Sequence, residues 1–330
     1  MTGEPPPKDM EIGQEDLARV IVGSPTKALT GYMHPWYAES FRGFGRPREL
    51  PRCGGWILER EVPGFPYLDA MGCYPLFFCQ DWSQLYLDLE EIAGDLVSLS
   101  MVADPWGEYD TIYLRQCFPD VFLPFKEHFV VDLRRPIESF VRRDQRKRAR
   151  RASKHVLVER CEDPKLFLAD WMSLYSNLIQ RYRITGIRVF SEYAFSKQMR
   201  IPGMVAFRAV HEGTTVAMHL WYTHGDIGYS HLRAESKLGY QFSASAALLW
   251  SAIEYFAASG LRWLNLGAGA GTRSGVKSSL TQHKEGWSTG TRTAYFCGRI
   301  LDQEAYWSIV KAKGISATDY FPAYRESEFG

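Results

Sequence analysis

The segment WLNLGAGAG, from Trp263 to Gly271, has the residue types and spacing that point most directly to chemistry. An apolar run that ends in alternating Gly and Ala is typical of a strand that stops beside the phosphate groups of a nucleotide. It is equally typical of a strand that runs into a tight turn. A dinucleotide site also needs a helix opening at the third glycine and an acidic residue about 20 positions later. No helix clearly begins at Gly271, so the glycines alone do not decide between the two interpretations.

LNLGAGAG also resembles the glycine motif of S-adenosylmethionine-dependent methyltransferases. Those enzymes have an acidic residue where this chain has Asn265, and most of their parallel sheet follows the motif. Only one further strand is evident after Gly271. A methyltransferase is therefore kept as an alternative function, because short glycine motifs are weak evidence.

A second group of chemically capable residues lies upstream, in a stretch of β-type sequence. Strand alternation predicts that Tyr229, His231 and Arg233 share one face. His231 has the residue type to accept a proton near neutral pH; the alternative is a histidine hydrogen-bonded within the sheet. Lys284, in the stretch HKEGW, is either a functional cation or a solvated surface lysine.

A basic segment, RRDQRKRARRA, precedes these residues. Its positive charge is predicted to spread around nearly a whole helix, with Asp144 as almost the only acidic residue. So dense a patch favours a phosphate-bearing partner: tRNA, a nucleotide-linked acceptor, or the phosphopantetheine arm and acidic helix of a carrier protein. The alternative is an unspecific solvated face. The candidate donor-phosphate contacts are Arg142, Arg143, Arg146, Lys147 and Arg150.

The elements that must position these residues follow from periodicity. Residues 54–133 predict short strands, 54–62 and 128–133 among them, around one helix at 83–97. The basic helix at 136–153 joins this part to a helix at 166–182, whose apolar face is Trp171, Leu174, Leu178 and Tyr182. Residues 204–232 predict an antiparallel meander. A helix at 243–260, with Ser243 or Ser245 as its cap and Gly260 at its end, leads into the strand at 263, and a last strand covers 293–300.

Composition is that of a globular protein: 330 residues, 45% hydrophobic and 23% charged, with a net charge of +1. This charge predicts no general affinity for nucleic acid or membrane beyond a local patch. The six scattered cysteines indicate buried free thiols and no metal site. The polar, Pro-rich start is unlike a signal peptide, and no apolar stretch approaches the roughly 20 residues of a membrane helix. We expect a cytoplasmic location.

The order meander, loop, helix, strand resembles the core of the GNAT acyltransferase superfamily. The chain also resembles the Fem-like branch of this superfamily, the peptidyl and aminoacyl transferases. The resemblance rests on YSHLRAESKLGYQFSASAALLWSAIEYFAASGLRWLNLGAGAG and then LTQHKEGWST, together with the upstream RRDQRKRARRA and WMSLYSNLIQRYRITG, and it covers most of the chain in order. The resemblance implies an α/β (α+β) fold of two tandem GNAT-like domains, each a mixed, largely antiparallel sheet flanked by helices. We expect a flexible N-terminus at 1–20, a first domain at 21–155 ending in the basic helix, and a second at 156–330 carrying the acyl-transfer cleft.

The resemblance also implies the chemistry. GNAT enzymes hold the donor carbonyl where two strands diverge, here expected near His231 to Ala234, and the Fem-like pattern gives Lys284 a role in stabilising negative charge. Gly239 matches the central glycine of the loop that binds the pyrophosphate of coenzyme A, but Ser236 and Gln241 depart from that loop. The expected catalytic residues are His231, Arg233 and Lys284, and the expected substrate-binding residues are Tyr222, Tyr229, Gly239, Ser243, Asn265, Gly267, Gly269 and Trp287.

The implied reaction is amide formation by transfer of an acyl or aminoacyl group to a small-molecule or peptide amine, in specialised metabolism or cell-wall-type peptide modification. The donor is tRNA, an acyl carrier protein or coenzyme A, the last being disfavoured by the incomplete loop. No tightly bound cofactor, no metal and no membrane partner are expected. Besides the methyltransferase, a non-catalytic RNA-binding module with this fold is kept as an alternative.

Overall fold

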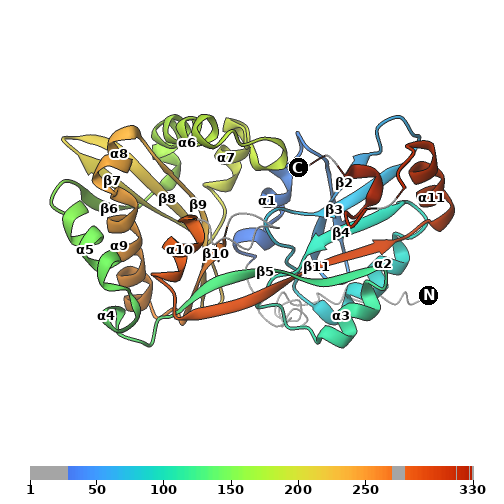
Figure 1. Ribbon diagram of the computed structural model, residues 1–330, viewed down its shortest axis with the longest axis horizontal. Helices are drawn as coiled ribbons and strands as arrows, with labels where there is room; N and C mark the ends of the chain where they lie inside the picture. The colour runs from blue at the N-terminus through green and yellow to red at the C-terminus, as the bar shows by residue number, and fades with distance from the viewer. Residues whose placement is uncertain (1–28, 270–278, 317, 327, 329–330) are drawn as a thin grey trace, which may run out of the picture.

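One continuous eleven-stranded sheet runs through the computed structural model, which describes residues 29–269, 279–316, 318–326 and 328 (Figure 1). The strand order is β1-β2-β3-β4-β11-β5-β10-β9-β8-β7-β6. The expected flexible segment 1–20 lies outside the described residues. The strands are β1 Arg46–Leu50, β2 Gly55–Glu61, β3 Leu68–Gly72, β4 Ser98–Val102, β5 Val121–Asp132, β6 Leu157–Cys161, β7 Met204–His211, β8 Thr214–His224, β9 Ile227–Glu235, β10 Trp263–Ala268 and β11 Gly290–Ile300.

Helices cover the sheet and its ends. The α-helices are α1 Pro35–Glu39, α2 Leu85–Glu91, α3 Thr111–Cys117, α4 Ile137–Phe140, α5 Arg143–Ala152, α6 Leu168–Tyr182, α7 Glu192–Gln198, α8 Lys237–Phe242, α9 Ala244–Ala258, α10 Ser279–Glu285 and α11 Gln303–Ala312. Short 3₁₀ helices are η1 Gly31–Met33, η2 Trp82–Gln84, η3 Pro164–Phe167, η4 Gly186–Arg188 and η5 Ala323–Arg325.

The same strand arrangement occurs twice. In the first half β1, β2 and β3 form an antiparallel meander and β3 pairs in parallel with β4. In the second half β7, β8 and β9 form the predicted antiparallel meander and β9 pairs in parallel with β10. A helix lies between the two parallel strands in each case, α2 in the first half and α8 with α9 in the second. The expected fold class, with two tandem halves of mixed, largely antiparallel sheet, is therefore confirmed.

The two halves are joined by exchanged strands at the centre of the sheet. β5, which follows the first half in sequence, pairs with β10 of the second half. β11, which follows the second half, pairs with β4 of the first. β5 and β11 also pair with each other along most of their length. Packing units therefore do not follow the division at residue 155: β11 runs from the centre of the sheet into the first half, and α11 lies at the first-half end of the molecule (Figure 1).

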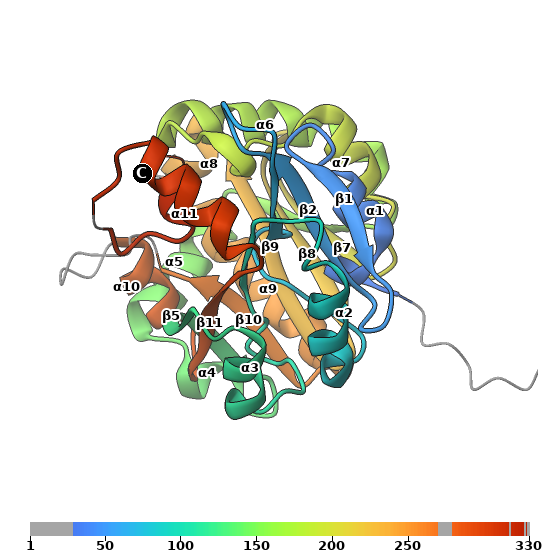
Figure 2. The ribbon, with the colours of Figure 1, turned by 90° about the vertical axis from the view of Figure 1, so that its right-hand side faces the viewer.

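The second-half sheet is covered on both faces. On one face α6 and α7 pack with alternate residues of β8 and β9, and Figure 2 shows these helices along one side of the strands. On the other face α9 packs with the intervening residues, such as Trp221 and Phe207, and α5 packs outside α9. Leu249, Ile253 and Phe256 are buried in this second core, as their spacing predicts.

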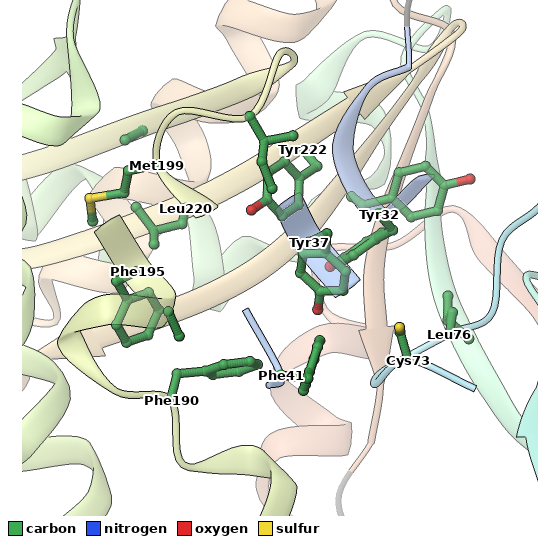
Figure 3. Packing of buried hydrophobic residues seen from close by; sticks show 14 of the residues in the cluster. Tyr32, Tyr37, Phe41, Cys73, Leu76, Phe190, Phe195, Met199, Leu220 and Tyr222 are labelled. Atoms are coloured by element: carbon green, nitrogen blue, oxygen red, sulfur yellow. The ribbon is translucent and has the colours of Figure 1, made fainter. Parts of the chain in front are cut away.

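The core under α6 and α7 also connects the halves. Tyr32 and Tyr37, from η1 and α1, pack against Tyr222 of β8, with Cys73 and Leu76 of the first half on their other side (Figure 3). Residues that belong to the expected first domain thus complete the hydrophobic core of the second.

Three predicted elements differ locally from the structure. The helix expected at 83–97 is shorter, η2 followed by α2 at 85–91, because the chain after Ile92 turns towards β4. The basic helix is broken into α4 and α5 at Val141, which is buried in an extended conformation. Tyr182 is 58% exposed instead of facing the core, because the last turn of α6 extends beyond the sheet.

Further predictions concern the start and end of α9 and the state of the cysteines. Ser243 has a left-handed backbone (φ 58°) at the joint between α8 and α9 and makes no side-chain cap, so the predicted capping role is wrong. Gly260 (φ 81°) follows the helix as predicted. All six cysteines are buried and free, as expected. Among the described residues, no helix combines the length and apolar character that crossing a membrane requires.

Candidate functional site

Strands β9 and β10 diverge near the middle of the sheet. Their parallel pairing covers only Ile227 with Trp263, Gly228 with Leu264 and Tyr229 with Asn265, whereas β9 continues to Glu235. Within the described chain, residues 230–235 of β9 have no strand partner on the β10 side. This confirms the divergence expected near His231 to Ala234.

A β-bulge at His231 changes which side chains share a face. Ser230 pairs with Trp221 and Leu232 with Leu220, so His231 is the extra residue on β9. Arg233 then pairs with His219, on the face opposite Tyr229 and His231. The predicted common face of the three residues is therefore wrong for Arg233, because simple alternation does not survive a bulge.

His231 lies in the aromatic core on the face towards α7. Its Nδ1 is 3.2 Å from the hydroxyl of Tyr32 and its Nε2 is 3.1 Å from Oε1 of Gln198. Since an amide oxygen only accepts, we assign the proton to Nε2 and let Nδ1 accept from Tyr32. Burial lowers the pKa of His231 to about 3. This geometry favours the alternative of a histidine hydrogen-bonded within the fold, and its catalytic role stays a prediction.

The two tyrosines expected in the cleft are buried beside His231. The Tyr222 hydroxyl donates to the carbonyl of Gln198 at 3.1 Å. The Tyr229 hydroxyl donates to Asp104 Oδ2, also at 3.1 Å, and so ties β9 to the first half of the molecule. Burial raises the pKa of Asp104 to about 7, although the backbone of Trp106, the Tyr229 hydroxyl and Arg292 each lower it. Sequence analysis missed Asp104, because only the folded chain brings it to Tyr229.

The opposite face carries a group of polar side chains that we call the cationic cluster: His219, Ser230, Arg233, His283 and Lys284. His219 Nε2 is 2.8 Å from Ser230 Oγ, and Arg233 approaches His283 Nε2 at 3.5 Å. Lys284 Nζ donates to the carbonyl of Ala268 at 2.7 Å. The cluster therefore borders both strands that diverge, β9 through Ser230 and Arg233, and β10 through Ala268.

Burial and nearby cations lower the pKa values of Lys284 and His283. Burial, followed by the charges of Arg233 and Lys126, lowers the pKa of Lys284 to about 7. Burial also lowers the pKa of His283 to about 3, with a further contribution from Arg233, Arg148 and Lys284. A strongly perturbed lysine in such surroundings is a candidate functional group.

Gly267, within β10, and Gly269, directly after it, make room for α10. Asn265 Oδ1 accepts from the backbone N–H of Gly267 at 2.8 Å and lies 3.1 Å from Nδ1 of His128. Gly267 has a φ of 76°, and a Cβ there would stand 3.0 Å from Lys284 Nζ. A Cβ on Gly269 would stand 2.2 Å from Thr281 Oγ1. Lys284 and Thr281 thus pack close to these two glycines, and the rest of the predicted turn, to Gly271, lies outside the described residues.

Gly239 and Ser243 belong to the α8 region. The N–H of Gly239 donates to the side chain of Ser236, which caps α8. A Cβ at Gly239 would stand 2.3 Å from the carbonyl oxygen of Val216, so this glycine permits close packing of α8 on β8. Ser243 supplies the left-handed joint described above. The structure brings neither residue into the cationic cluster.

The basic helix α5 is anchored beside the cluster. The indole of Trp287 donates to Gln145 Oε1 at 3.2 Å, and the N–H of Arg142 donates to the carbonyl of Gly286 at 2.9 Å. Gln145, Ala149 and Ala152 are buried, which corrects the prediction of charge around nearly the whole helix. The exposed basic residues of this segment, which we call the basic face, are Arg142, Arg143, Lys147, Arg148, Arg150 and Arg151, with Arg146 half-buried.

Comparison with known proteins gives a family for part of the chain and a fold for nearly all of it. Residues 139–274 match the family model described as an acetyltransferase (GNAT) domain. No curated protein matches the sequence. The structure is similar to the crystal structure of FemX, with a TM-score of 0.62 and 16% identity over 83% of this chain and 93% of that one. It is also similar to L-PGS from Bacillus licheniformis, with a TM-score of 0.58 and 16% identity over 88% of this chain and 98% of that one.

At this identity the two structures establish the fold, and the family model establishes the domain that holds the bulge and the diverging strands. Residues 139–274 thus match a GNAT domain, and the chain as a whole is similar in fold to FemX and L-PGS.

Proposed function

We propose that the protein is an N-acyltransferase that forms an amide by moving an acyl or aminoacyl group from an ester or thioester donor to an amine. The observation that carries this proposal is the divergence of β9 from β10 beside a buried lysine, Lys284. Acyl transfer needs a held carbonyl, an unprotonated amine next to it, and donors aimed at the oxygen that becomes negative. In this proposal, backbone N–H groups of β9 at its unpaired edge hold the donor carbonyl. The ammonium group of Lys284 stabilises the negative charge that develops on the carbonyl oxygen.

The state of Lys284 suits this role. With a pKa of about 7, the lysine is partly neutral in the free protein, and an anionic intermediate nearby would favour its protonated form. The charge is thus present when the carbonyl oxygen carries negative charge. Arg233, in contact with His283 on the same face, is the second cation of the cluster.

The donor is proposed to be charged tRNA or an acylated carrier protein. Coenzyme A is disfavoured as the donor, because Ser236 and Gln241 depart from the pyrophosphate loop and Gly239 packs closely against Val216. The basic face of α5, fixed to α10 through Trp287 and Gly286, suits a polyanionic donor whose acyl end reaches the cluster. Donors of this kind are found in the cytoplasm, which is the location we propose.

The two alternatives differ in what the structure must provide. A methyltransferase of the type suggested by LNLGAGAG needs a parallel sheet around the motif, whereas β10 has an antiparallel neighbour, β5. A non-catalytic RNA-binding module would need the basic face but would not need Lys284 or the diverging strands. The acyltransferase proposal uses all three features.

The test is transfer from a panel of donors. The purified protein is incubated with pooled aminoacyl-tRNA, an acylated carrier protein or acetyl-CoA, together with an amine-containing small-molecule extract of the source cells. We expect a new amide, identified by mass spectrometry, with one of the first two donors. Binding of RNA with no transfer from any donor would support the RNA-binding alternative instead.

A further inference from the structure

His219 and Ser230 form a hydrogen-bonded pair at the point where β9 and β10 diverge. Nε2 of His219, on β8, lies 2.8 Å from Oγ of Ser230, on β9. Ser230 directly follows Tyr229, the last residue of β9 that pairs with β10. The hydroxyl therefore stands at the start of the open edge, and its side chain is half-buried, while His219 behind it is only 2% exposed.

The remaining nitrogen of His219 distinguishes this histidine from His231. Both ring nitrogens of His231 contact protein groups, as is usual for a structural histidine. In the described part of the chain, Nδ1 of His219 is buried and has no hydrogen-bond partner. An unpartnered nitrogen in a buried polar cluster costs stability, so its presence in a native fold calls for an explanation.

The surroundings keep His219 neutral in the resting protein, so that one of its ring nitrogens carries no proton. Burial lowers the pKa of His219 well below its ordinary value, and the cations Arg233 and Lys284, then His283 and His231, lower it further. These groups come from β9 and α10, the elements that carry the rest of the cluster.

We propose that Ser230 is a catalytic residue that relays the proton of the attacking amine, and that His219 is the positioning residue that receives the proton from Ser230. This inference rests on the proposed acyl transfer. As the new N–C bond forms, the carbonyl π electrons move to oxygen, the amine proton passes to Ser230 Oγ, and the serine proton passes to His219 Nε2. When the C–O or C–S bond to the donor breaks, the proton returns through Ser230 to the leaving oxygen or sulfur. No proton or electron is left over, and no further reactant is needed.

The test is the kinetics of Ser230→Ala and Ser230→Thr with the donor that supports transfer. General acid–base catalysis typically contributes at least about 100-fold, so we expect Ser230→Ala to lower kcat by about that factor with little change in KM. Ser230→Thr keeps the hydroxyl and should retain most of the activity. The matched control is Ser100→Ala, a buried strand serine on β4 away from the cluster, which should leave kcat unchanged.

A second readout reports on the relay itself. A thiol is a better leaving group than an alcohol and needs a returned proton less. The loss caused by Ser230→Ala should therefore be smaller with a thioester than with an oxygen ester of the same acyl group. A merely structural serine would lower both rates by the same factor.

The outcomes separate the relay from the proposed function. If Lys284→Met abolishes transfer but Ser230→Ala keeps kcat within about 2-fold, the relay is wrong and the acyltransferase stands. Equal losses in Ser230→Ala and Ser230→Thr, with unchanged thermal unfolding, would also overturn the relay. A wild-type protein inactive with every donor removes the proposed function, and the relay with it.

Discussion

Lys284 is the residue on which the proposed chemistry depends most. Its ammonium group is buried against the carbonyl of Ala268 and lies among other cations. We expect Lys284→Met, which keeps the apolar stem but removes the charge, to lower kcat by about 100-fold to 1,000-fold, as the loss of one preorganised donor typically does. Steady-state kinetics check this, and near-normal turnover would remove the main catalytic assignment.

The same substitution has a predictable effect on stability. The pKa of Lys284 is about 7 in the fold and 10.5 in its ordinary state, so the fold disfavours the charged form. The favourable contribution of the neutral lysine is present above pH 10.5 and is lost as pH falls towards 7. Lys284→Met should therefore raise the Tm at pH 7 more than at pH 10. Thermal unfolding at both values measures the difference, and an equal change at the two pH values would contradict the depressed pKa.

Lys284 could be singled out from the sequence because the stretch HKEGW matches the Fem-like pattern, and its catalytic role stays a prediction. Its depressed pKa could not be predicted, because desolvation depends on how α10 packs over the turn after β10. Arg233 was assigned to the wrong face, since a one-residue bulge leaves no clear mark in an alternating strand. His219, Ser230 and Asp104 were missed because pairings between distant segments give these residues their partners.

Among the elements, α5 carries the clearest prediction. Lys147 is exposed on the basic face, and Lys311 is exposed on α11 at the opposite end of the molecule (Figure 1). Lys147→Glu should raise the KM of a polyanionic donor and weaken the dependence of binding on salt, because one fewer counterion-releasing contact remains. The matched change Lys311→Glu alters net charge equally and should leave the KM unchanged. Identical kinetics for the two variants at low salt would mean that the basic face is only solvated.

The α8 region gives a prediction about the donor. Because Gly239 is held by its close approach to Val216 and Ser236 is used as a cap, no loop of backbone N–H groups is evident for a diphosphate. We expect calorimetry to detect no tight binding of acetyl-CoA. Micromolar affinity, equivalent to about 8 kcal/mol, would require a formed diphosphate site and would contradict this account.

The order of the elements could largely be predicted: the meander, the following helix and the strand at 263 lie where periodicity placed them. The break in the basic helix could not, because it depends on burial of Val141 and on the hydrogen bond from Arg142 to Gly286. The role of the glycines in LNLGAGAG could not be decided from the sequence, because it also depends on packing. Only the packing of α10 shows that Gly267 and Gly269 make space for Lys284 and Thr281.

At the scale of the whole molecule, the exchange of β5 and β11 makes the two halves one unit. The sequence predicts two similar halves but contains no sign that their last strands cross over. The seam between the halves includes the contact of Asp104 with Tyr229, in which a buried carboxyl has its pKa raised from 3.8 to about 7. The site on β9 is therefore supported from both halves.

The contact between Asp104 and Tyr229, which joins the two halves, should make the stability of the protein depend on pH. A raised pKa means that the fold favours protonated Asp104, and this contribution is present below pH 3.8 and lost as pH rises through 7. Asp104→Asn, which cannot ionise but keeps an oxygen for Tyr229, should stabilise the protein at pH 8 relative to wild type and much less at pH 5. Urea unfolding at the two pH values measures the free energy of unfolding of both proteins. A difference between them that does not change with pH would show that the fold does not raise the pKa of Asp104.

The central claim is that this molecule transfers an acyl or aminoacyl group to an amine through a site that contains Lys284. The most direct measurement compares wild type and Lys284→Met in the donor panel, with mass spectrometry of the small-molecule products. The account predicts an acceptor whose mass increases by one acyl or aminoacyl residue, formed from tRNA or carrier-protein donor by wild type and at least about 100-fold more slowly by the variant. The contradictory result is the absence of any amide with all three donors while S-adenosylmethionine is consumed and a methylated product appears.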